Sequence, residues 1–414
     1  MVVSPACRFC DAPLETTMVD LGMSPLCEDF LLSDRLNQLE PFFPLHVYVC
    51  SDCFLVQLEE YVSPKEIFDE IAYFSSYSTA WLEHARDYVE SMISRFQLDS
   101  GSRVLEVASN DGYLLQYFVE RAIPALGIEP ASNVAEAARE KGVETRVEFF
   151  DVALAEELSS EGLKADLIVG NNVLAQVADL NGFVAGFPLV LAEGGVVTLE
   201  FPHVMQLMAH NQYDTIYHEH FSYFSLGTCQ RIFERHGLQV FDVDELWTHG
   251  GSLRLYLKHA NDDSKPIQDS VAELVERESK FGLFDLDTYP KFGQQVENTK
   301  RQLLDFLIGA KRAGKSVAGY GAPGKGNTLL NYCGIRTDFI DYLCDRNVYK
   351  HGRYTPGTHI PIFSPEHIAE TKPDYVLILP WNLKDEIMAQ LSYIGDWGAE
   401  FVVPIPEVAT FKPS

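Results

Sequence analysis

Residues 217–220 read Tyr-His-Glu-His, and this short run could support three kinds of chemistry. Two imidazoles, a carboxylate and a phenol could bind a metal, exchange protons with a substrate, or form a polar wall. A metal site is disfavoured, because H-x-H supplies two ligands and no third or fourth is evident nearby. Imidazole titrates near neutral pH and therefore suits acid–base catalysis. The surrounding elements must decide between a catalytic group and a wall.

Four of the eight cysteines form two Cys-x-x-Cys pairs, Cys7 with Cys10 and Cys50 with Cys53. Paired knuckles of this kind place four thiolates tetrahedrally around zinc. Four protein ligands leave no open coordination position, so this zinc would build a fold and do no chemistry. Two disulfides are the alternative, which is less favoured because nothing in the sequence indicates an oxidising compartment.

The composition is that of a globular protein, with 46% hydrophobic and 12% aromatic residues. A net charge of −28 does not provide the basic surface that nucleic-acid binding needs. No apolar run approaches the ~18 residues that cross a bilayer, and the first residues do not form a secretory signal. We therefore expect a cytoplasmic protein without nucleic-acid or membrane partners, and its 414 residues predict two or three domains.

The order of the expected elements predicts an α/β protein in three parts. Residues 47–57 read as strand, knuckle and strand, which is typical of a zinc ribbon. Residues 102–201 alternate short apolar strands with helices, and this alternation indicates a parallel sheet with crossover helices. The same alternation restarts at residue 315. The expected parts are a zinc-binding module (1–65), a second domain (66–260) with a helical lead-in (66–100), and a helical connector with a smaller α/β domain (261–414).

Two loops follow strands as nucleotide-binding loops do. The first, EVASNDGYL, runs from Glu106 to Leu114 and contains a single glycine, Gly112. The next strand ends at Glu129, where α/β nucleotide sites bind ribose hydroxyls. Because the loop is acidic, it suits a cationic ligand better than a pyrophosphate. S-adenosylmethionine, which carries a sulfonium and an ammonium group, fits this description.

The second loop, GYGAPGKG, runs from Gly319 to Gly326 and satisfies G-x-G-x-x-G. Asp345 closes the following strand, so the loop taken alone indicates NAD. It suits the diphosphate of a sugar nucleotide equally well, with Lys325 as the counter-charge. Basic residues outnumber acidic ones in the region from Lys311 to Arg353, which favours an anionic ligand.

Taken in order, these motifs resemble the zinc-containing, S-adenosylmethionine-dependent sugar C-methyltransferases of deoxysugar biosynthesis. The resemblance covers essentially the whole chain. It rests on the four cysteines, SNDG, GIEP, YHEHFSYFS, HGGSLRLY, GYGAPGKGNTLLNYCGI and PGTHIPI. It implies a zinc-ribbon-like module, a central class I Rossmann-like methyltransferase domain and a C-terminal pseudo-Rossmann α/β domain. The implied cofactors are S-adenosylmethionine and structural zinc.

The resemblance further implies a substrate and a mechanism. The substrate is a nucleotide-linked keto deoxysugar, with dTDP as the expected nucleotide, and a monomer methylates a ring carbon next to the ketone through a base-generated enolate. Four catalytic residues are implied: His220 as base, Glu219 to fix its tautomer, Tyr217 as a donor to the sugar, and Tyr73. Gln176 departs from the family pattern, which has a histidine there, and this puts a second acid–base role at that position in doubt.

The remaining expected site residues fall into two sets. Those expected to bind S-adenosylmethionine are Glu106, Asn110, Asp111, Gly112, Glu129, Asp151, Asn171 and Asn172. Those expected to bind the sugar nucleotide are His249, Gly321, Lys325, Asn327, Arg353 and His359.

Two other functions remain open. One is an NAD-dependent oxidoreductase that uses the Gly319–Gly324 loop and Asp345. The other is a non-catalytic protein that binds a sugar nucleotide. The sequence does not name the sugar, the nucleotide or the ring carbon.

Overall fold

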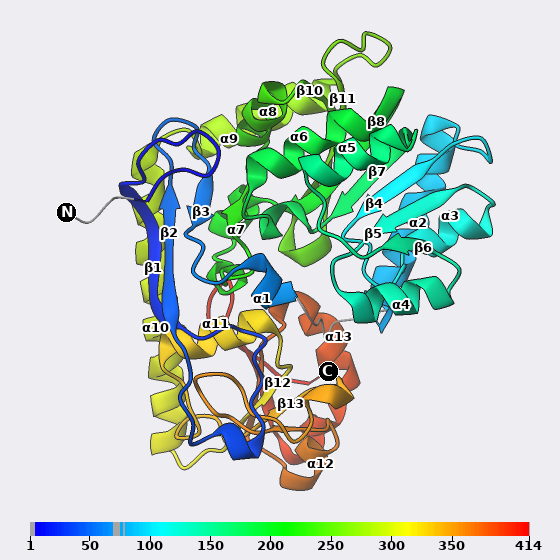
Figure 1. Cartoon of the computed structure of the whole chain (residues 1–414). Coiled ribbons are helices and arrows are strands. Elements are labelled where there is room, and N and C mark those ends of the chain that lie inside the picture. Colours follow the sequence, from blue (N-terminus) through cyan, green and yellow to red (C-terminus); the bar gives the residue numbers. More distant parts are fainter. Residues whose placement is uncertain (1–4, 69–74, 78, 414) are drawn as a thin grey trace. The chain divides into compact units, whose positions relative to one another are not determined.

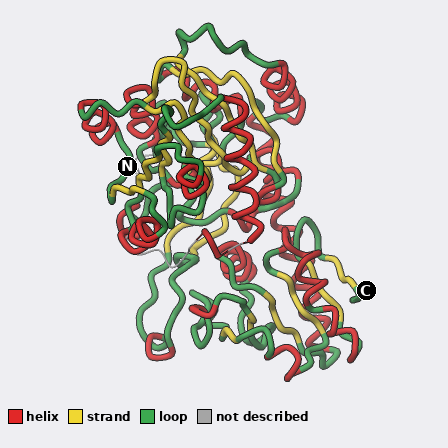
Figure 2. Tube along the Cα trace, turned by 90° about the vertical axis from the view of Figure 1, so that its right-hand side faces the viewer, coloured by secondary structure: helices red, strands yellow, loops and turns green. Residues whose placement is uncertain are grey.

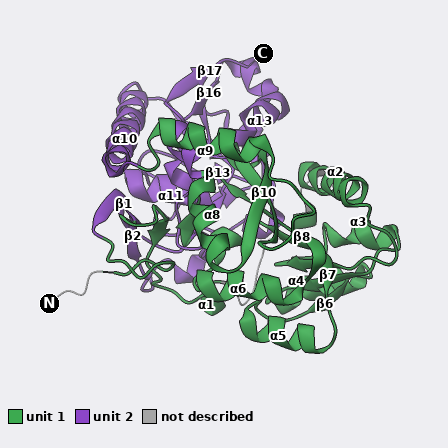
Figure 3. Ribbon diagram, turned by 90° about the horizontal axis from the view of Figure 1, so that it is seen from above, with its two compact units in different colours: residues 1–14, 50–203, 221–284 green, residues 15–49, 204–220, 285–414 purple. Residues whose placement is uncertain are grey.

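A computed structural model of the chain (Figure 1) describes residues 5–68, 75–77 and 79–413. The chain forms two compact units whose segments interleave along the sequence (Figure 3). Unit 1 comprises residues 1–14, 50–203 and 221–284, and unit 2 comprises residues 15–49, 204–220 and 285–414. The expected division into three consecutive domains stays a prediction, whereas the α/β fold class is confirmed.

Unit 1 is built on a seven-stranded sheet with the order β10-β11-β8-β7-β4-β5-β6. The five strands β4 to β8 are parallel, and β10 and β11 complete the sheet in antiparallel pairing. The bounds are β4 (Val104–Val107), β5 (Ala125–Ile128), β6 (Glu144–Arg146), β7 (Ala165–Asn171), β8 (Leu191–Pro202), β10 (Leu238–Leu246) and β11 (Ser252–His259). Central strands such as β7, ADLIVGN, are almost continuously apolar because helices cover both faces of a parallel sheet.

The helices of unit 1 include the crossovers between these strands. They are α1 (Pro64–Phe68), α2 (Thr79–Phe96), α3 (Leu115–Glu120), α4 (Ser132–Glu140), α5 (Val152–Ser160), α6 (Leu180–Val190), α8 (Leu226–Arg235) and α9 (Asp269–Phe281). One core cluster joins α2 and α3 to the sheet through Val89, Met92, Phe118, Val104 and Leu167. A separate short pair, β3 (Val56–Leu58) with β9 (Ser222–Tyr223), is antiparallel.

Unit 2 contains a six-stranded sheet with the order β14-β13-β12-β15-β16-β17, parallel except for the last pair. Its strands are β12 (Val317–Tyr320), β13 (Leu343–Cys344), β14 (Ile362–Phe363), β15 (Tyr375–Ile378), β16 (Glu400–Val403) and β17 (Ala409–Phe411). A hairpin of β1 (Thr16–Ser24) and β2 (Phe43–Val49) also belongs to this unit. Its helices are α7 (Val204–Ala209), α10 (Tyr289–Arg312), α11 (Gly324–Cys333), α12 (His367–Thr371) and α13 (Lys384–Gln390). Figure 2 shows strands in yellow and helices in red.

A buried carboxylate on α9 holds the start of α8. Both Glu278 and His203 are almost completely buried, and His203 Nε2 lies 2.8 Å from a carboxylate oxygen of Glu278. The backbone N–H groups of Leu226 and Gly227 donate to the same carboxylate at 2.6 and 2.9 Å. These N–H groups belong to the first turn of α8 and have no partner within that helix, so the carboxylate supplies their acceptor.

Glu278→Ala should therefore cost about 3–5 kcal/mol of the free energy of unfolding, because His203 and two backbone N–H groups would lose their buried acceptor. Glu276→Ala is the matched control, because its carboxylate lies on the same helix, is 66% exposed and pairs only with Lys280 among the described residues. The control should change stability by less than ~0.5 kcal/mol. Urea unfolding of both variants tests this, and equal stabilities would contradict the assignment.

Candidate functional site

The two cysteine pairs of unit 1 adopt the same local backbone structure. In the first, Asp11 N donates to Cys7 O and Cys7 N to Ala12 O; in the second, Phe54 N donates to Cys50 O and Cys50 N to Leu55 O. The residue after each pair has a positive φ, 63° at Asp11 and 61° at Phe54. Each knuckle thus turns both of its sulfur atoms toward the same side.

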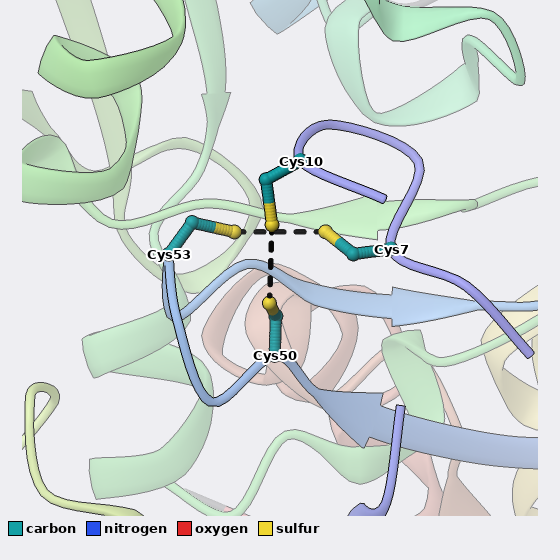
Figure 4. A group of neighbouring side chains, drawn as sticks. All are labelled: Cys7, Cys10, Cys50 and Cys53. Atoms are coloured by element: carbon teal, nitrogen blue, oxygen red, sulfur yellow. Dashed lines mark hydrogen bonds between the residues drawn. The ribbon is translucent and has the colours of Figure 1, made fainter. Parts of the chain in front are cut away.

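The four Sγ atoms converge on one point (Figure 4) and lie within 4.8 Å of one another. The closest pairs, Cys7 with Cys53 and Cys10 with Cys50, are 3.6 and 3.5 Å apart, which is far longer than a disulfide bond. Tetrahedral zinc with four thiolate ligands fits this donor set.

Gln57 supports the cysteine cluster and was not expected from the sequence. Its side-chain Nε2 donates to Cys7 Sγ at 3.1 Å, and its Oε1 accepts from Arg8 N at 2.9 Å. Such outer hydrogen bonds orient metal ligands. No sequence motif marks a single glutamine four residues after a knuckle.

The first predicted nucleotide loop lies at the carboxyl end of β4. Ala108, Asn110 and Gly112 all have positive φ angles, of 58°, 47° and 72°. A Cβ at Gly112 would lie 3.0 Å from the side chain of Val143, so the loop packs closely against the residue that precedes β6. Glu129 fixes the loop from the next strand, because its Oε2 accepts from Asn110 N at 2.9 Å and its Oε1 from Ala131 N at 2.9 Å.

Buried negative charge accumulates at this edge of the sheet. Glu106 is fully buried, and neither of its carboxylate oxygens has a hydrogen-bond partner among the described residues. Burial, with the nearby charges of Glu129 and Asp111, raises the pKa of Glu106 well above its ordinary value. Asp111 is bonded through Oδ2 to Lys141 at 2.9 Å and also to Ser76. Buried acceptors of this kind call for a cationic or hydrogen-donating ligand.

The neighbouring strand contributes two amides to the same edge. Asn171, the last residue of β7, is 8% exposed, and Asn172 adopts a φ of 56°. In the described part of the chain, the side-chain oxygen of each lacks a partner. Asp151 differs, because it is exposed and its Oδ1 caps α5 by accepting from Leu154 N at 2.8 Å. The groups present therefore fit the ammonium, sulfonium and ribose hydroxyls of S-adenosylmethionine.

The Tyr-His-Glu-His run belongs to unit 2 and forms a turn, not the start of a helix. His220 N donates to Tyr217 O at 2.9 Å, and this turn brings the two rings to a centroid distance of 4.0 Å. His220 Nδ1 donates to the backbone oxygen of Thr215 at 3.0 Å. A carbonyl can only accept, so the proton of the neutral ring sits on Nδ1 and Nε2 is the basic nitrogen.

Glu219 has a different partner from the one predicted. Its carboxylate accepts a hydrogen bond from Cys27 Sγ at 3.7 Å, whereas Thr215 orients His220. Burial, reinforced by the charge of Glu28, raises the pKa of Glu219 to about 7. The prediction that Glu219 fixes the tautomer of His220 is therefore wrong, and Glu219 is instead a group able to exchange protons near neutral pH. Tyr73 lies outside the described residues.

The glycines of the second loop are explained by packing inside unit 2. A Cβ at Gly319 would overlap Leu343, and one at Gly321 (φ +82°) would come within 2.5 Å of Pro380. At Gly324 it would lie 2.8 Å from Cys27 Sγ and 3.0 Å from Glu28 Oε1. The G-x-G-x-x-G pattern therefore reflects close approach of this chain's own atoms.

The carboxylate of Asp345 is also used within the loop region. Its Oδ2 accepts from Ala322 N at 2.6 Å and its Oδ1 from Asn347 N at 2.7 Å. Asp345 thus holds its own loop as Glu129 holds the first one, so these contacts do not separate NAD from a sugar nucleotide. NAD is disfavoured instead by the glycines of the loop, whose open sides are filled by atoms of this chain.

Lys325 stands at the start of α11 among polar and aromatic groups. Its Nζ lies 4.5 Å from the ring centre of Trp381 and is bonded to Asn382. Trp381 Nε1 in turn donates to Asp214 Oδ2 at 2.7 Å. Burial raises the pKa of the fully buried Asp214 to about 7, although Lys325 and Trp381 act in the opposite direction. Burial lowers the pKa of Lys325, and the charge of Asp214 acts in the opposite direction.

The other residues expected to bind the sugar nucleotide are dispersed. Asn327 is buried and donates to Cys27 O at 2.7 Å, and His359 pairs with Glu40 at 2.8 Å. Arg353 is half-buried in unit 2. His249 belongs to unit 1, where its ring meets Trp81 edge-on at a centroid distance of 5.4 Å.

Comparison with known proteins identifies the family. Three family models match: "Putative zinc binding domain" over residues 7–68, "Methyltransferase domain" over 81–243, and "C-methyltransferase C-terminal domain" over 247–406. The chain is 36% identical over 401 residues to the C-methyltransferase NovU of Streptomyces niveus, covering 97% of this chain and 95% of that protein. It therefore belongs to the zinc-containing, S-adenosylmethionine-dependent C-methyltransferases, with S-adenosylmethionine and structural zinc as its cofactors.

Solved structures give weaker likenesses. An S-adenosylmethionine-dependent methyltransferase from Clostridium acetobutylicum has a TM-score of 0.36 and 13% identity, over 44% of this chain and 92% of that one. Another from Anabaena variabilis has a TM-score of 0.34 and 14% identity, over 41% and 83% of the two chains. Scores this low carry no argument. In the described part of the chain, no helix is both long and apolar enough to cross a lipid bilayer.

The cysteine cluster predicts about one zinc ion per chain in protein purified without chelators. Its binding should contribute ~10–16 kcal/mol of apparent free energy, so Cys50→Ser should lose the zinc and unfold unit 1. Cys344→Ala, which alters a single buried cysteine of unit 2, should retain the zinc. Metal analysis with circular dichroism measures both effects. Folded wild-type protein without zinc would contradict the prediction.

Glu129→Ala should weaken S-adenosylmethionine binding about 10- to 100-fold, since hydrogen bonds to charged groups contribute ~1.5–3 kcal/mol. Each oxygen of Glu129 keeps a second lone pair for a ribose hydroxyl after bonding its backbone amide. Asp166→Ala is the control, because Asp166 lies at the start of β7 and accepts from Arg103 N. Calorimetry that shows tight NAD binding, or equal donor affinity in both variants, would refute the donor site.

Proposed function

We propose that this C-methyltransferase acts on a ring carbon next to the ketone of a nucleotide-linked keto deoxysugar, and that it does so through an enolate. The observation that carries the proposal is the turn in which the rings of Tyr217 and His220 lie 4.0 Å apart and Thr215 O accepts the Nδ1 proton of His220. This arrangement presents a basic nitrogen and a phenol side by side. Methyl transfer to oxygen or nitrogen uses a lone pair that is already present, so it has less need of such a base.

The chemistry explains the need for this pair. S-adenosylmethionine supplies an electrophilic methyl group, but a saturated sugar carbon has no lone pair with which to attack it. A neighbouring ketone allows a base to remove the C–H proton, because the charge then moves to the ketone oxygen. The enzyme must therefore supply a base that is neutral near pH 7 and a donor for the developing oxyanion.

The residues of the turn can fill these roles. His220 Nε2 removes the proton, and Thr215 stabilises the imidazolium that forms through its hydrogen bond with Nδ1. Tyr217 donates a hydrogen bond to the sugar. Glu219, whose pKa burial raises to about 7, exchanges protons with the site without orienting the imidazole.

The nucleotide part of the substrate is assigned from charge. Lys325 and Arg353 are half-buried basic residues of unit 2, and either side chain can pair with a phosphate oxygen. The Glu28 carboxylate would lie 3.0 Å from a Cβ at Gly324, so it stands at the start of α11. Its negative charge disfavours any diphosphate bound by the loop backbone, and we therefore assign the diphosphate of the sugar nucleotide to the side chains of Lys325 and Arg353.

His220→Asn should lose ~10²–10⁴-fold in activity, the contribution of a positioned base, while both ligands still bind. The direct measurement is solvent deuterium exchange into the keto sugar with an unreactive methyl-donor analogue bound. His220→Asn should abolish this exchange, whereas Tyr217→Phe should only lower its rate.

His210→Asn is the control for that measurement, because His210 is exposed on the same unit. His218 is less suitable, since its buried ring lies 3.2 Å from Pro44 O and its loss would disturb packing. Exchange at the wild-type rate in His220→Asn, together with its loss in Tyr217→Phe, would assign the proton to the tyrosine and refute the role given to His220.

A further inference from the structure

A buried carboxylate joins three side chains at the carboxyl edge of the unit 1 sheet. Glu200 lies near the end of β8, in register with Asn171 of β7 and opposite Arg254 of β11. Ligands of open α/β sheets bind outside this edge. Helix α2 brings a histidine, His84, to the same carboxylate. Neither Glu200 nor His84 was among the residues expected to act.

The contacts of Glu200 are short and well defined. Its Oε1 accepts from Thr248 Oγ1 at 3.0 Å, and its Oε2 accepts from Arg254 Nη2 at 2.6 Å. His84 Nε2 lies 3.1 and 3.0 Å from the two oxygens. Arg254 Nη2 and His84 Nε2 are 3.3 Å apart, and both act as donors that converge on the carboxylate.

Burying Glu200 does not require His84. Threonine and arginine already supply one donor to each oxygen, so the histidine is an additional partner. Burial opposes ionisation of Glu200, but the hydrogen bond from His84 and the charge of Arg254 outweigh it and lower the pKa to about 2. The carboxylate is thus permanently ionised and fixes a proton on His84 Nε2, as the aspartate of a hydrolase triad does for its histidine. Proton exchange is left to Nδ1.

The surroundings connect His84 to the methyl-donor loop. Trp81 stacks on His84 at a centroid distance of 4.9 Å, and its ring centre also lies 6.1 Å from that of Tyr113, which directly follows Gly112 of that loop. Arg254 lies over the ring of Tyr88, and the charge of Glu106 acts on Tyr88 in turn. The His84 side chain is 11% exposed, so bulk water reaches it only in part.

We propose that His84 is a second acid–base residue of the methyl transfer, which contacts the acceptor, and that Glu200 is its positioning residue. This inference rests on the proposed function, since it assumes a carbon acceptor activated by a neighbouring carbonyl. In the imidazolium form, His84 Nδ1–H donates its proton to the carbonyl oxygen while a base takes the C–H proton.

Methyl transfer and return of the proton then complete the reaction. The resulting enol carbon forms a bond to the methyl group as the bond from methyl to sulfur breaks, and S-adenosylhomocysteine leaves with the electron pair of that bond. The carbonyl re-forms and its proton returns to His84. One proton, held by that base, is released to solvent.

This role makes activity depend on the protonation of His84. The imidazolium form is the active one, so the rate should fall at alkaline pH. Among the described residues, four titratable or charged groups contact His84 or its stacking partner Trp81: Glu200, Arg254, Tyr113 and His249. Tyr88 lies behind them, under the guanidinium of Arg254.

The test compares three variants by transfer of labelled methyl to nucleotide keto sugars across a range of pH. His84→Gln should lower kcat ~10²-fold or more, with S-adenosylmethionine affinity unchanged, and should remove the alkaline limb of the profile. Glu200→Gln should keep that limb but move it to lower pH, because the imidazolium loses its carboxylate. His259→Gln is the control; its ring bonds only Leu191 O among the described residues, so the profile should not change.

Activity of His84→Gln equal to that of the wild type, or an unchanged alkaline limb, would overturn the inference. If Glu200→Gln does not fold, His84→Gln still decides the matter. If the wild type methylates no keto sugar nucleotide, the proposed function fails and His84 is examined by NMR of protein labelled with ¹³C-histidine. Addition of S-adenosylhomocysteine should then shift the His84 signal more than the His259 signal, and an unshifted His84 signal would refute its place in the reaction site.

Discussion

Four thiolates brought to one point repel one another unless a divalent cation lies between them, and much of unit 1 depends on this constraint. The knuckles are bonded to the methyltransferase fold at several places. Arg8 donates to Ala178 O, Asn181 to Phe9 O and Thr228 to Cys53 O. The strand β3 follows the second knuckle and pairs with β9, directly after the Tyr-His-Glu-His run. Zinc thus fixes the backbone of unit 1 around β3 and β9.

Two buried glutamates show how the chain separates stability from function. Glu278 is surrounded by donors that satisfy its oxygens, and it holds the start of α8. Glu106 is equally buried, yet the described residues provide no hydrogen-bond donor to either oxygen. Burying a carboxylate without donors costs free energy, and a cationic cofactor bound at this edge of the sheet would offset that cost. A buried carboxylate therefore points to the cofactor site only when its oxygens lack hydrogen-bond donors.

Local sequence patterns predicted those parts of the site in which the residues lie close together in the chain. The Cys-x-x-Cys pairs and the loop from Glu106 to Gly112 are of this kind, because short spacing restricts how such side chains can point. Local sequence patterns gave wrong predictions where the contacting residue is distant in the chain. The glycines after β12 make room for Cys27, Leu343 and Pro380, so their spacing imitates a dinucleotide fingerprint. The carboxylate next to His220 was taken for its orienting group, whereas a turn gives that role to Thr215.

The group around Glu200 could not be found in the sequence at all. His84 lies 116 residues before Glu200, and Thr248 and Arg254 lie 48 and 54 residues after it, so the group forms only when helix α2 packs on the sheet and β11 pairs with β8. Long-range strand pairing of this kind leaves no local motif. A single histidine on an amphipathic helix reads as an ordinary surface residue until its carboxylate partner is known.

The central claim is that a sugar carbon receives the methyl group. The most direct measurement is incubation of the zinc-loaded protein with S-adenosylmethionine carrying a ¹³C-labelled methyl group and a panel of nucleotide-linked keto deoxysugars, followed by NMR of the products. The account predicts a ¹³C-methyl signal coupled to a ring carbon adjacent to the ketone. A methyl signal attached to oxygen or nitrogen, or methylation only of compounds that lack a carbonyl, would contradict it.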